Sequence, residues 1–391
     1  MNAPYLMDNY PPQPVTFVRG EGSRLWDVEG KAYLDFLGGL AVTSLGHAHP
    51  VVAEAIATQA RTLLHVCNLF GTTIGPEVAE TLDRLLGGGG KARPGGEPMG
   101  KVFFSNSGAE ANECAIKLAR KWAGPGRYAV VSAYGSFHGR TLATLAATGQ
   151  PTKHEPFQPM PEGFRHVALG DIEALDAAVD PRVVAAVLLE PIQGEGGVNV
   201  PPKGFLGEVR RLCDERDVLL IMDEVQTGLG RTGDWFAFQH EGIRPDVVTM
   251  AKALGNGMPI GACWARSEVA AAFVPGDHGT TFGGQPLAAA AARTTLAVME
   301  AEDVPARAAR AGARLAEGLS ALPGVTSVRG RGLLLAAELA GRPSKDVAAA
   351  ALARGLVVNA VTPTAIRLAP SLLVTDDELD EALSILKEVL A

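Results

Sequence analysis

Short, continuous apolar segments that alternate with helical patterns place the strongest constraint on how this chain folds. Val183–Leu189, Val218–Met222 and Val247–Met250 are apolar along their whole length and have the length of strands. Leu206–Arg216, which lies between the first two, has the apolar spacing of a helix. Strands without polar positions are typical of a parallel sheet covered by helices on both faces. The sequence therefore predicts an α/β fold with a mostly parallel sheet.

The pattern changes after residue 285. An alanine-rich helix is predicted over Pro286–Ala301, and later segments include the short strands Val325–Val328 and Ala365–Leu368. This mixture indicates a smaller α+β domain. We expect residues 1–50 to belong to the small domain, residues 51–285 to form the large domain, and residues 286–391 to form the C-terminal part of the small domain.

Two segments lie outside this alternation. Phe17–Gly20 and Leu25–Asp27 flank a glycine-containing turn, which predicts a β-hairpin. Residues 87–100 read GGGGKARPGGEPMG, and their glycines and prolines indicate a flexible surface loop rather than a phosphate cradle.

Composition excludes several classes of protein. With 391 residues, 47% hydrophobic and 20% charged, the chain can bury a large core and does not resemble a disordered or coiled-coil protein. Its net charge of −8 and the lack of a basic run argue against nucleic acid as a partner. Four cysteines without a C-x-x-C pair do not form a disulfide framework. No apolar run approaches the roughly 20 residues that span a membrane, and no signal peptide is expected, so the expected location is the cytoplasm.

The segment from Ser105 to Glu110 joins a predicted strand, Lys101–Phe104, to a predicted helix, Ala109–Trp122. Ser107 and Glu110 have the spacing of a capping box, which alone would explain them. The alternative is an anion site, because a helix start with glycine leaves backbone N–H groups open to a phosphate.

Two charged residues follow apolar strands. Asp223 ends the strand over Val218–Met222, where it either forms an ion pair within the protein or pairs with a cationic nitrogen of a ligand. Lys252 has small apolar neighbours and precedes a glycine-rich turn. It is either a solvated lysine or a desolvated amine that acts as a nucleophile.

Two arginines could bind a carboxylate. Arg140 lies in the segment Ser136–Thr141, and Arg367 lies within the apolar segment Ala365–Pro370. An arginine in apolar surroundings needs a carboxylate partner, which is either a protein glutamate or a substrate.

A different class of enzyme is a weaker alternative. Residues 228–233 match the G-x-G-x-x-G pattern of a nicotinamide-dependent dehydrogenase, but five residues separate Gly228 from the preceding strand. His47 and His49 have no acidic or cysteine neighbour in sequence, so no metal site is expected.

Taken in order, the phosphate turn, the strand-end aspartate and the loop lysine resemble the class III (ω-amino) aminotransferases. These are pyridoxal 5′-phosphate enzymes with the aspartate-aminotransferase-like fold, called fold type I. The resemblance covers nearly the whole chain. It is carried by residues 45–50 (LGHAHP), 106–112 (NSGAEAN), 137–141 (FHGRT), 190–197 (EPIQGEGG), 223–228 (DEVQTG), 251–255 (AKALG) and 367–372 (RLAPSL).

The resemblance implies the roles of the cofactor site. Lys252 would bind the cofactor covalently and move the proton, and Asp223 would keep the pyridine nitrogen protonated. The remaining contacts would come from Ser107, Gly108 and Ala109 to the phosphate, Phe137 and Val225 to the two ring faces, Gln226 to the ring hydroxyl, and Thr281 to the phosphate of the neighbouring subunit in a homodimer.

The resemblance also implies the substrates. The terminal amine of N-acetyl-L-ornithine would pass to 2-oxoglutarate, giving glutamate, in a step of arginine biosynthesis. Arg367 would bind the carboxylate beside the reacting carbon of 2-oxoglutarate, and Arg140 would bind the distal one. With N-acetylornithine bound, Glu195 would neutralise Arg367. Glu190 is a second acidic residue here, and Thr280 is an expected contact from the partner subunit.

Related ω-amines remain open as substrates. Leu40 and His138 favour the acylated donor over ornithine, because ornithine aminotransferases typically carry a tyrosine near the first and a bulkier residue at the second. Succinylornithine, succinyl-diaminopimelate and 4-aminobutyrate are further alternatives. A catalytically idle member of the fold is disfavoured, because all of the charged candidate residues are present.

Overall fold

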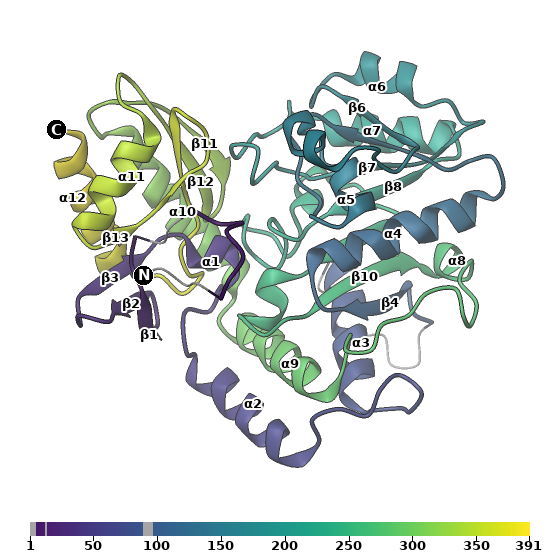
Figure 1. Ribbon diagram of the computed structural model, residues 1–391, viewed down its shortest axis with the longest axis horizontal. Coiled ribbons are helices and arrows are strands. Elements are labelled where there is room, and N and C mark those ends of the chain that lie inside the picture. Colours follow the sequence, from purple (N-terminus) through teal and green to yellow (C-terminus); the bar gives the residue numbers. More distant parts are fainter. Residues whose placement is uncertain (1–4, 12–13, 89–96) are drawn as a thin grey trace.

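The computed structural model describes residues 5–11, 14–88 and 97–391, which form a larger and a smaller lobe (Figure 1). Most of the predicted glycine-rich loop, residues 89–96, lies outside the described residues.

A seven-stranded sheet forms the centre of the larger lobe, in the order β4-β10-β9-β8-β7-β5-β6. Neighbouring strands from β9 to β6 are parallel, and β10 runs antiparallel to both β4 and β9. The prediction of a mostly parallel sheet is confirmed. The strands are β4 Gly100–Ser105, β5 Ala129–Ala133, β6 Phe164–Val167, β7 Val184–Leu189, β8 Leu219–Asp223, β9 Val247–Met250 and β10 Gly261–Arg266.

Helices cover both faces of this sheet because its central strands are apolar on both. In β8, Leu219 and Ile221 pack into the hydrophobic cluster beneath α4, whereas Leu220 and Met222 pack into the cluster that contains α7. The helices of this lobe are α2 Pro50–Thr62, α3 Ile74–Leu86, α4 Gly108–Ala123, α5 Leu142–Ala147, α6 Ile172–Ala178, α7 Phe205–Glu215, α8 Ser267–Ala270 and α9 Pro286–Ala301, with the 3₁₀ turns η1 Pro151–Lys153, η2 Glu155–Phe157, η3 Ala237–Glu241 and η4 Lys252–Gly255.

The smaller lobe joins the two ends of the chain. The predicted hairpin is confirmed as β1 and β2, and with β3 it forms a sheet that ends in β13, from the C-terminal region. A second sheet has the order β11-β12-β15-β14. The elements are β1 Phe17–Glu21, β2 Arg24–Asp27, β3 Ala32–Asp35, α1 Gly38–Ala41, α10 Val304–Ser320, β11 Val325–Arg331, β12 Leu334–Leu339, α11 Ser344–Ala353, β13 Leu356–Val357, β14 Asn359–Ala360, β15 Ala365–Leu368 and α12 Asp376–Leu390.

The predicted helix over residues 286–301 has the expected bounds, as α9. It packs against α2, α3 and the turn η4, which are elements of the larger lobe. The domain boundary at residue 50 remains our proposal. The proposed boundary at residue 285 assigns α9 to the small domain, whereas its packing favours a boundary after α9.

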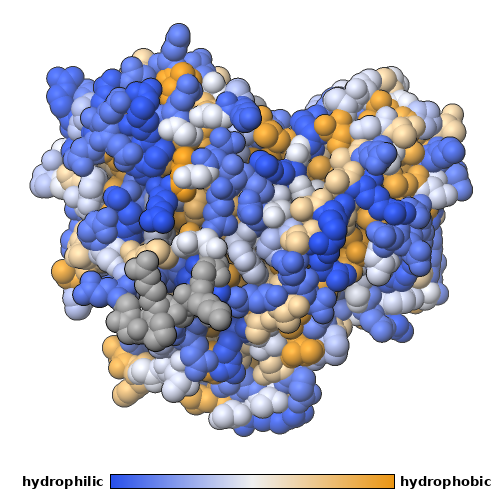
Figure 2. All heavy atoms as spheres, turned by 180° about the vertical axis from the view of Figure 1, so that it is seen from behind, coloured by the Kyte–Doolittle hydropathy of each residue, from blue (hydrophilic) through white to orange (hydrophobic). Residues whose placement is uncertain are grey.

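No helix within the described ranges is long and apolar enough to cross a membrane. Seen from behind, hydrophobic residues form small, separate groups among hydrophilic ones, and the surface is indented between the lobes (Figure 2).

A close contact in the small lobe gives a first test of the fold. A Cβ atom on Gly312 of α10 would lie 2.1 Å from the carbonyl oxygen of Gly332. We expect Gly312→Ala to destabilise the protein by about 1–3 kcal/mol, because the backbone must move. Gly207→Ala in α7 is the matched control, since no atom lies within 4 Å of its Cβ position, and it should stabilise by up to about 1 kcal/mol. Thermal unfolding of both variants checks this; equal midpoints would contradict it.

Candidate active site

A cavity of about 380 Å³ opens where the central parallel strands end. Strands β7, β8 and β9 are parallel, so the residues that follow them meet at one edge of the sheet. Most of the predicted site residues line this cavity, namely Ser107, Gly108, Ala109, Phe137, Arg140, Glu190, Glu195, Asp223, Val225, Gln226 and Lys252.

The start of α4 forms one wall of the cavity. Ser107 is the N-cap, and its hydroxyl oxygen accepts the N–H of Glu110 at 3.2 Å. The Glu110 carboxylate returns to the N–H of Asn106 at 2.8 Å, one residue earlier than in a standard capping box. The N–H groups of Gly108 and Ala109 have no acceptor within the helix. A Cβ on Gly108 would lie 2.8 Å from Val225, so glycine leaves this wall open to an anion.

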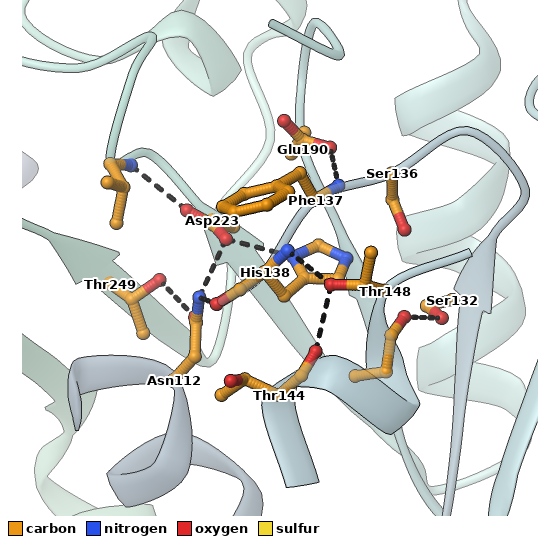
Figure 3. Close-up of polar contacts among 12 residues, drawn as sticks. Asn112, Ser132, Ser136, Phe137, His138, Thr144, Thr148, Glu190, Asp223 and Thr249 are labelled. Carbon is orange, nitrogen blue, oxygen red and sulfur yellow. Dashed lines mark hydrogen bonds and ion pairs between the residues drawn. The ribbon is translucent and has the colours of Figure 1, made fainter. Parts of the chain in front are cut away.

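Asp223 lies at the end of β8, is 4% exposed, and is held by three donors (Figure 3). Its Oδ2 is 2.8 Å from Nδ1 of His138 and accepts Nδ2 of Asn112 at 2.8 Å. Its Oδ1 accepts the N–H of Val225 at 3.1 Å. Because a carboxylate oxygen accepts hydrogen bonds, His138 carries its proton on Nδ1 in this contact.

The residues that support Asp223 are not among those predicted for the cofactor site. Asn112 lies on the buried side of α4, and its Oδ1 accepts the hydroxyl of Thr249 at 2.7 Å. For His138, the sequence predicted only a role in distinguishing the substrates. Its backbone N–H bonds Thr148, and its Nε2 is buried with no hydrogen-bond partner among the described residues. The available signal was that Asn112 is polar on the otherwise apolar face of a predicted helix.

Two further glutamates near the cavity are almost fully buried. Glu190 accepts the N–H groups of Phe137 and Gly194, at 3.0 and 3.2 Å, and burial raises its pKa to about 7. Glu224 accepts the N–H of Phe238 at 2.9 Å and the hydroxyl of Thr227, and burial raises its pKa to about 7 as well. Glu224 supports the chain behind the cavity, whereas Glu190 lines it.

Lys252 begins the 3₁₀ turn η4 and reaches the cavity from a strained backbone. Its φ is 44°, in the left-handed region that side chains other than glycine rarely adopt. Such strain is typical of functional sites. Burial lowers the pKa of Lys252, the charge of Arg367 lowers it further, and Glu195 and Asp223 act in the opposite direction. A lowered pKa favours the neutral, nucleophilic amine.

Arg367 lies in β15 of the small lobe and is 1% exposed. Its Nη1 donates to Glu195 at 2.8 Å and to Oε1 of Gln226 at 3.1 Å, and its Nη2 donates to Asn359 at 3.0 Å. Burial raises the pKa of Glu195, but the charge and hydrogen bond of Arg367 lower it, and the pKa is lowered overall. Arg367 therefore has a protein carboxylate as its partner, one of the two possibilities that the sequence left open.

The remaining predicted residues differ in position. Arg140 is exposed and lies 5.6 Å from the centre of the Phe137 ring. Thr280 and Thr281 do not line the cavity of this chain. Thr280 lies beside it, because its hydroxyl oxygen accepts Nδ2 of Asn106 at 3.3 Å.

The dehydrogenase alternative is not supported by the fold. Residues 228–233 form turns rather than a strand-to-helix junction. Arg231 at their centre is buried, and its guanidinium donates to the carbonyl oxygens of Leu333 and Pro370 in the small lobe. The glycines of this segment allow a close contact between the lobes.

The histidine pair is a separate case, because Nε2 of His47 is hydrogen-bonded to the carboxylate of Asp35 at 2.8 Å.

Comparison with known proteins identifies the family. The model of the family "Aminotransferase class-III" matches residues 5–390. The chain belongs to the class III aminotransferases. This aminotransferase is 50% identical over 388 residues to the acetylornithine aminotransferase of Corynebacterium efficiens, covering 99% of this chain and 95% of that protein. It is 46% identical over 391 residues to the acetylornithine aminotransferase of Methanothermobacter thermautotrophicus, covering 99% and 96%.

Solved structures agree with this assignment. An ornithine aminotransferase from Toxoplasma gondii, whose active site holds PLP at partial occupancy, superposes on this aminotransferase with a TM-score of 0.91, at 36% identity and covering 99% and 92% of the two chains. The acetylornithine aminotransferase of Elizabethkingia anophelis gives a TM-score of 0.86 at 34% identity, covering 99% and 96%. The expected fold of the class III family is confirmed.

Burial of Glu224 predicts a pH dependence of stability. A carboxyl group whose pKa rises from 4.5 to about 7 on folding stabilises the native state at low pH, and this stabilisation is lost as the pH rises from about 4.5 to about 7. Glu224→Gln does not titrate, and the hydroxyl of Thr227 can rotate to accept its amide. We expect the variant to become more stable than the wild type as the pH rises from 5 to 8, by about 3 kcal/mol at most.

Thermal unfolding at pH 5, 6, 7 and 8 measures this difference. Glu215→Gln, at an exposed position on α7, is the matched control and should track the wild type. Parallel curves for Glu224→Gln and the wild type would show that the buried carboxyl does not titrate in this range.

Proposed function

We propose that this aminotransferase transfers the terminal amino group of N-acetyl-L-ornithine to 2-oxoglutarate, giving N-acetyl-L-glutamate semialdehyde and glutamate, with pyridoxal 5′-phosphate as cofactor. The observation that carries the proposal is the Arg367–Glu195 pair at the cavity, opposed by Arg140, which has no ion pair among the described residues. Relatives named acetylornithine aminotransferases, at up to 50% identity over nearly the whole chain, support this substrate.

The cavity fits pyridoxal phosphate on three independent observations. The open helix start at Gly108 suits a phosphate. Arg367 has only donors, so Oε1 of Gln226 must face it, and the buried Nε2 of Gln226 is left without a partner among the described residues. That donor suits the ring hydroxyl. The buried carboxylate of Asp223 suits a protonated pyridine nitrogen. When bound, the cofactor supplies an electron sink for the carbanion at the reacting carbon.

The chain itself moves the proton and orients the substrate. Lys252, with its lowered pKa, is the base that takes the proton from the reacting carbon of the donor and the acid that returns it. His138 and Asn112 hold Asp223 in place through its Oδ2. Phe137 and Val225, which both line the cavity, confine a flat ring between them.

Arg367 and Glu195 allow one cavity to take two unlike substrates. 2-Oxoglutarate has a carboxylate beside its reacting carbon, which displaces Glu195 and pairs with Arg367. N-acetylornithine has none at its reacting end, and Glu195 remains on Arg367. The paired state in the structure suits the donor, because an unpaired buried guanidinium is costly. Glu195 is 29% exposed in its side chain, so it has room to leave.

The active unit is proposed to be a homodimer, in the cytoplasm. Neither Thr280 nor Thr281 lines the cavity of this chain, as expected if they serve the partner subunit. Asn68 bonds the carbonyl oxygen of Thr280 and connects this turn to an exposed apolar surface. That surface consists of Leu69, Phe70 and Phe282, which are 88%, 70% and 65% exposed.

An absorbance titration tests the proposed function. The purified holoenzyme should show a yellow visible band that bleaches with N-acetylornithine in the absence of an acceptor and returns with 2-oxoglutarate. Bleaching by ornithine, succinylornithine, succinyl-diaminopimelate or 4-aminobutyrate, but not by N-acetylornithine, would overturn the substrate. Absence of a band after addition of pyridoxal phosphate would overturn the cofactor.

The Arg367–Glu195 pair predicts opposite effects on the two half-reactions. Glu195→Gln leaves Arg367 without its carboxylate when the donor is bound, so the N-acetylornithine half-reaction should slow by about 10- to 100-fold. The 2-oxoglutarate half-reaction should change little. Arg367→Ala should mainly impair the 2-oxoglutarate half-reaction. Single-turnover absorbance measures each half; equal losses in both halves for either variant would contradict the exchange.

A further inference from the structure

A second positive side chain lies near Arg140. Lys153 belongs to the turn η1, which follows α5, and its Nζ is 5.9 Å from the centre of the Phe137 ring. Arg140 belongs to the loop before α5, and its guanidinium carbon is 5.6 Å from the same centre. Phe137 and Arg140 line the cavity, and Lys153 contacts the ring of Phe137 without being a lining residue itself. Two cations therefore share one aromatic ring at the cavity wall.

Neither cation has a counterion in the described part of the chain. Lys153 donates to the side-chain oxygen of Gln150, and no ion pair involves Lys153 or Arg140. Arg367, on the small-lobe side, differs because it has Glu195. Burial and the charge of Arg140 lower the pKa of Lys153, and Glu195 raises it. Two like charges thus lie close together without a protein counterion, and an added anion would be attracted to both.

The charge of the donor's unreactive end suits this arrangement. In N-acetylornithine that end carries a carboxylate and a neutral amide, with a net charge of −1. In ornithine it carries a carboxylate and an ammonium group, with a net charge of zero. Two cations attract the first and gain little from the second, because the ammonium group is repelled. Acylation of the α-amino group is then recognised through the charge that it removes.

We propose that Lys153 determines the specificity for Nα-acylated donors. Together with Arg140 it forms a dicationic subsite for the α-carboxylate, and it disfavours a free α-ammonium group. The proposal rests on the proposed function and names the feature of the donor that the site reads.

Lys153→Gln and Lys153→Arg test the role of the charge. In Lys153→Gln, kcat/KM of the donor half-reaction should fall about tenfold for N-acetylornithine, mainly through KM. It should stay equal or rise for ornithine, so the ratio between the donors falls tenfold or more. Lys153→Arg, which keeps the charge, should restore the ratio. Lys387→Gln, exposed on α12 at the outer edge of the small lobe (Figure 1), removes the same charge and should change nothing.

Binding of a non-reacting probe separates recognition from turnover. N-acetyl-L-norvaline has the acylated end of the donor and no terminal amine. By calorimetry on the holoenzyme, Lys153→Gln should weaken its binding about tenfold, and binding of L-norvaline should not weaken.

Equal losses for both donors, or no change in Lys153→Gln, would overturn the specificity proposal while bleaching of the wild type by N-acetylornithine still supports the proposed function. A wild type that does not bleach with N-acetylornithine would overturn the proposed function itself.

Discussion

Burial of the Asp223 carboxylate is the constraint on which the rest of the site depends. A carboxylate that is 4% exposed needs donors, and here they come from α4, from the loop after β5 and from the chain after β8. The loop after β5 meets the chain after β8 because β5, β7 and β8 are parallel and end at one edge of the sheet. Glu190 and Lys252 follow the strands on either side of β8, so the same geometry brings them to the same cavity.

The sequence predicted most residues that line the site, but not the residues that hold Asp223 in place. Asp223 and Lys252 could be found because each follows an apolar run whose end is visible in the sequence. Asn112 and His138 could not, because they lie 111 and 85 residues from Asp223. A polar residue on a helix is ordinary until the buried carboxylate that it faces is known. The roles that came with the family resemblance stay predictions until the variants are measured.

Elements with a strong hydrophobic pattern were predicted from the sequence. Elements whose place in the sheet depends on tertiary contacts were not. The strand β6, with Arg165 and His166 at its centre, lies at the sheet edge and lacks the continuous apolar pattern of β7 and β8. β10 is apolar, but its antiparallel insertion between β4 and β9 has no local signal. The segment 228–233 has the glycines of a nucleotide loop. Gly230 and Gly233 instead pack closely against Val304 and Ala309 of α10, and Arg231 between them contacts the small lobe.

The distribution of counterions around the cavity matches the chemistry of the two proposed substrates. At Arg367 the substrates differ, since only one has a carboxylate beside its reacting carbon, and there the protein supplies Glu195 as a replaceable partner. At Arg140 and Lys153 both proposed substrates would bring a carboxylate, and there the described residues supply none. A permanent counterion beside Arg140 and Lys153 would weaken the binding of both substrates. Without Glu195, the buried charge of Arg367 would be unpaired in the half of the cycle in which the donor is bound. The protein therefore supplies a counterion only at Arg367, where one of the two proposed substrates has no carboxylate to offer.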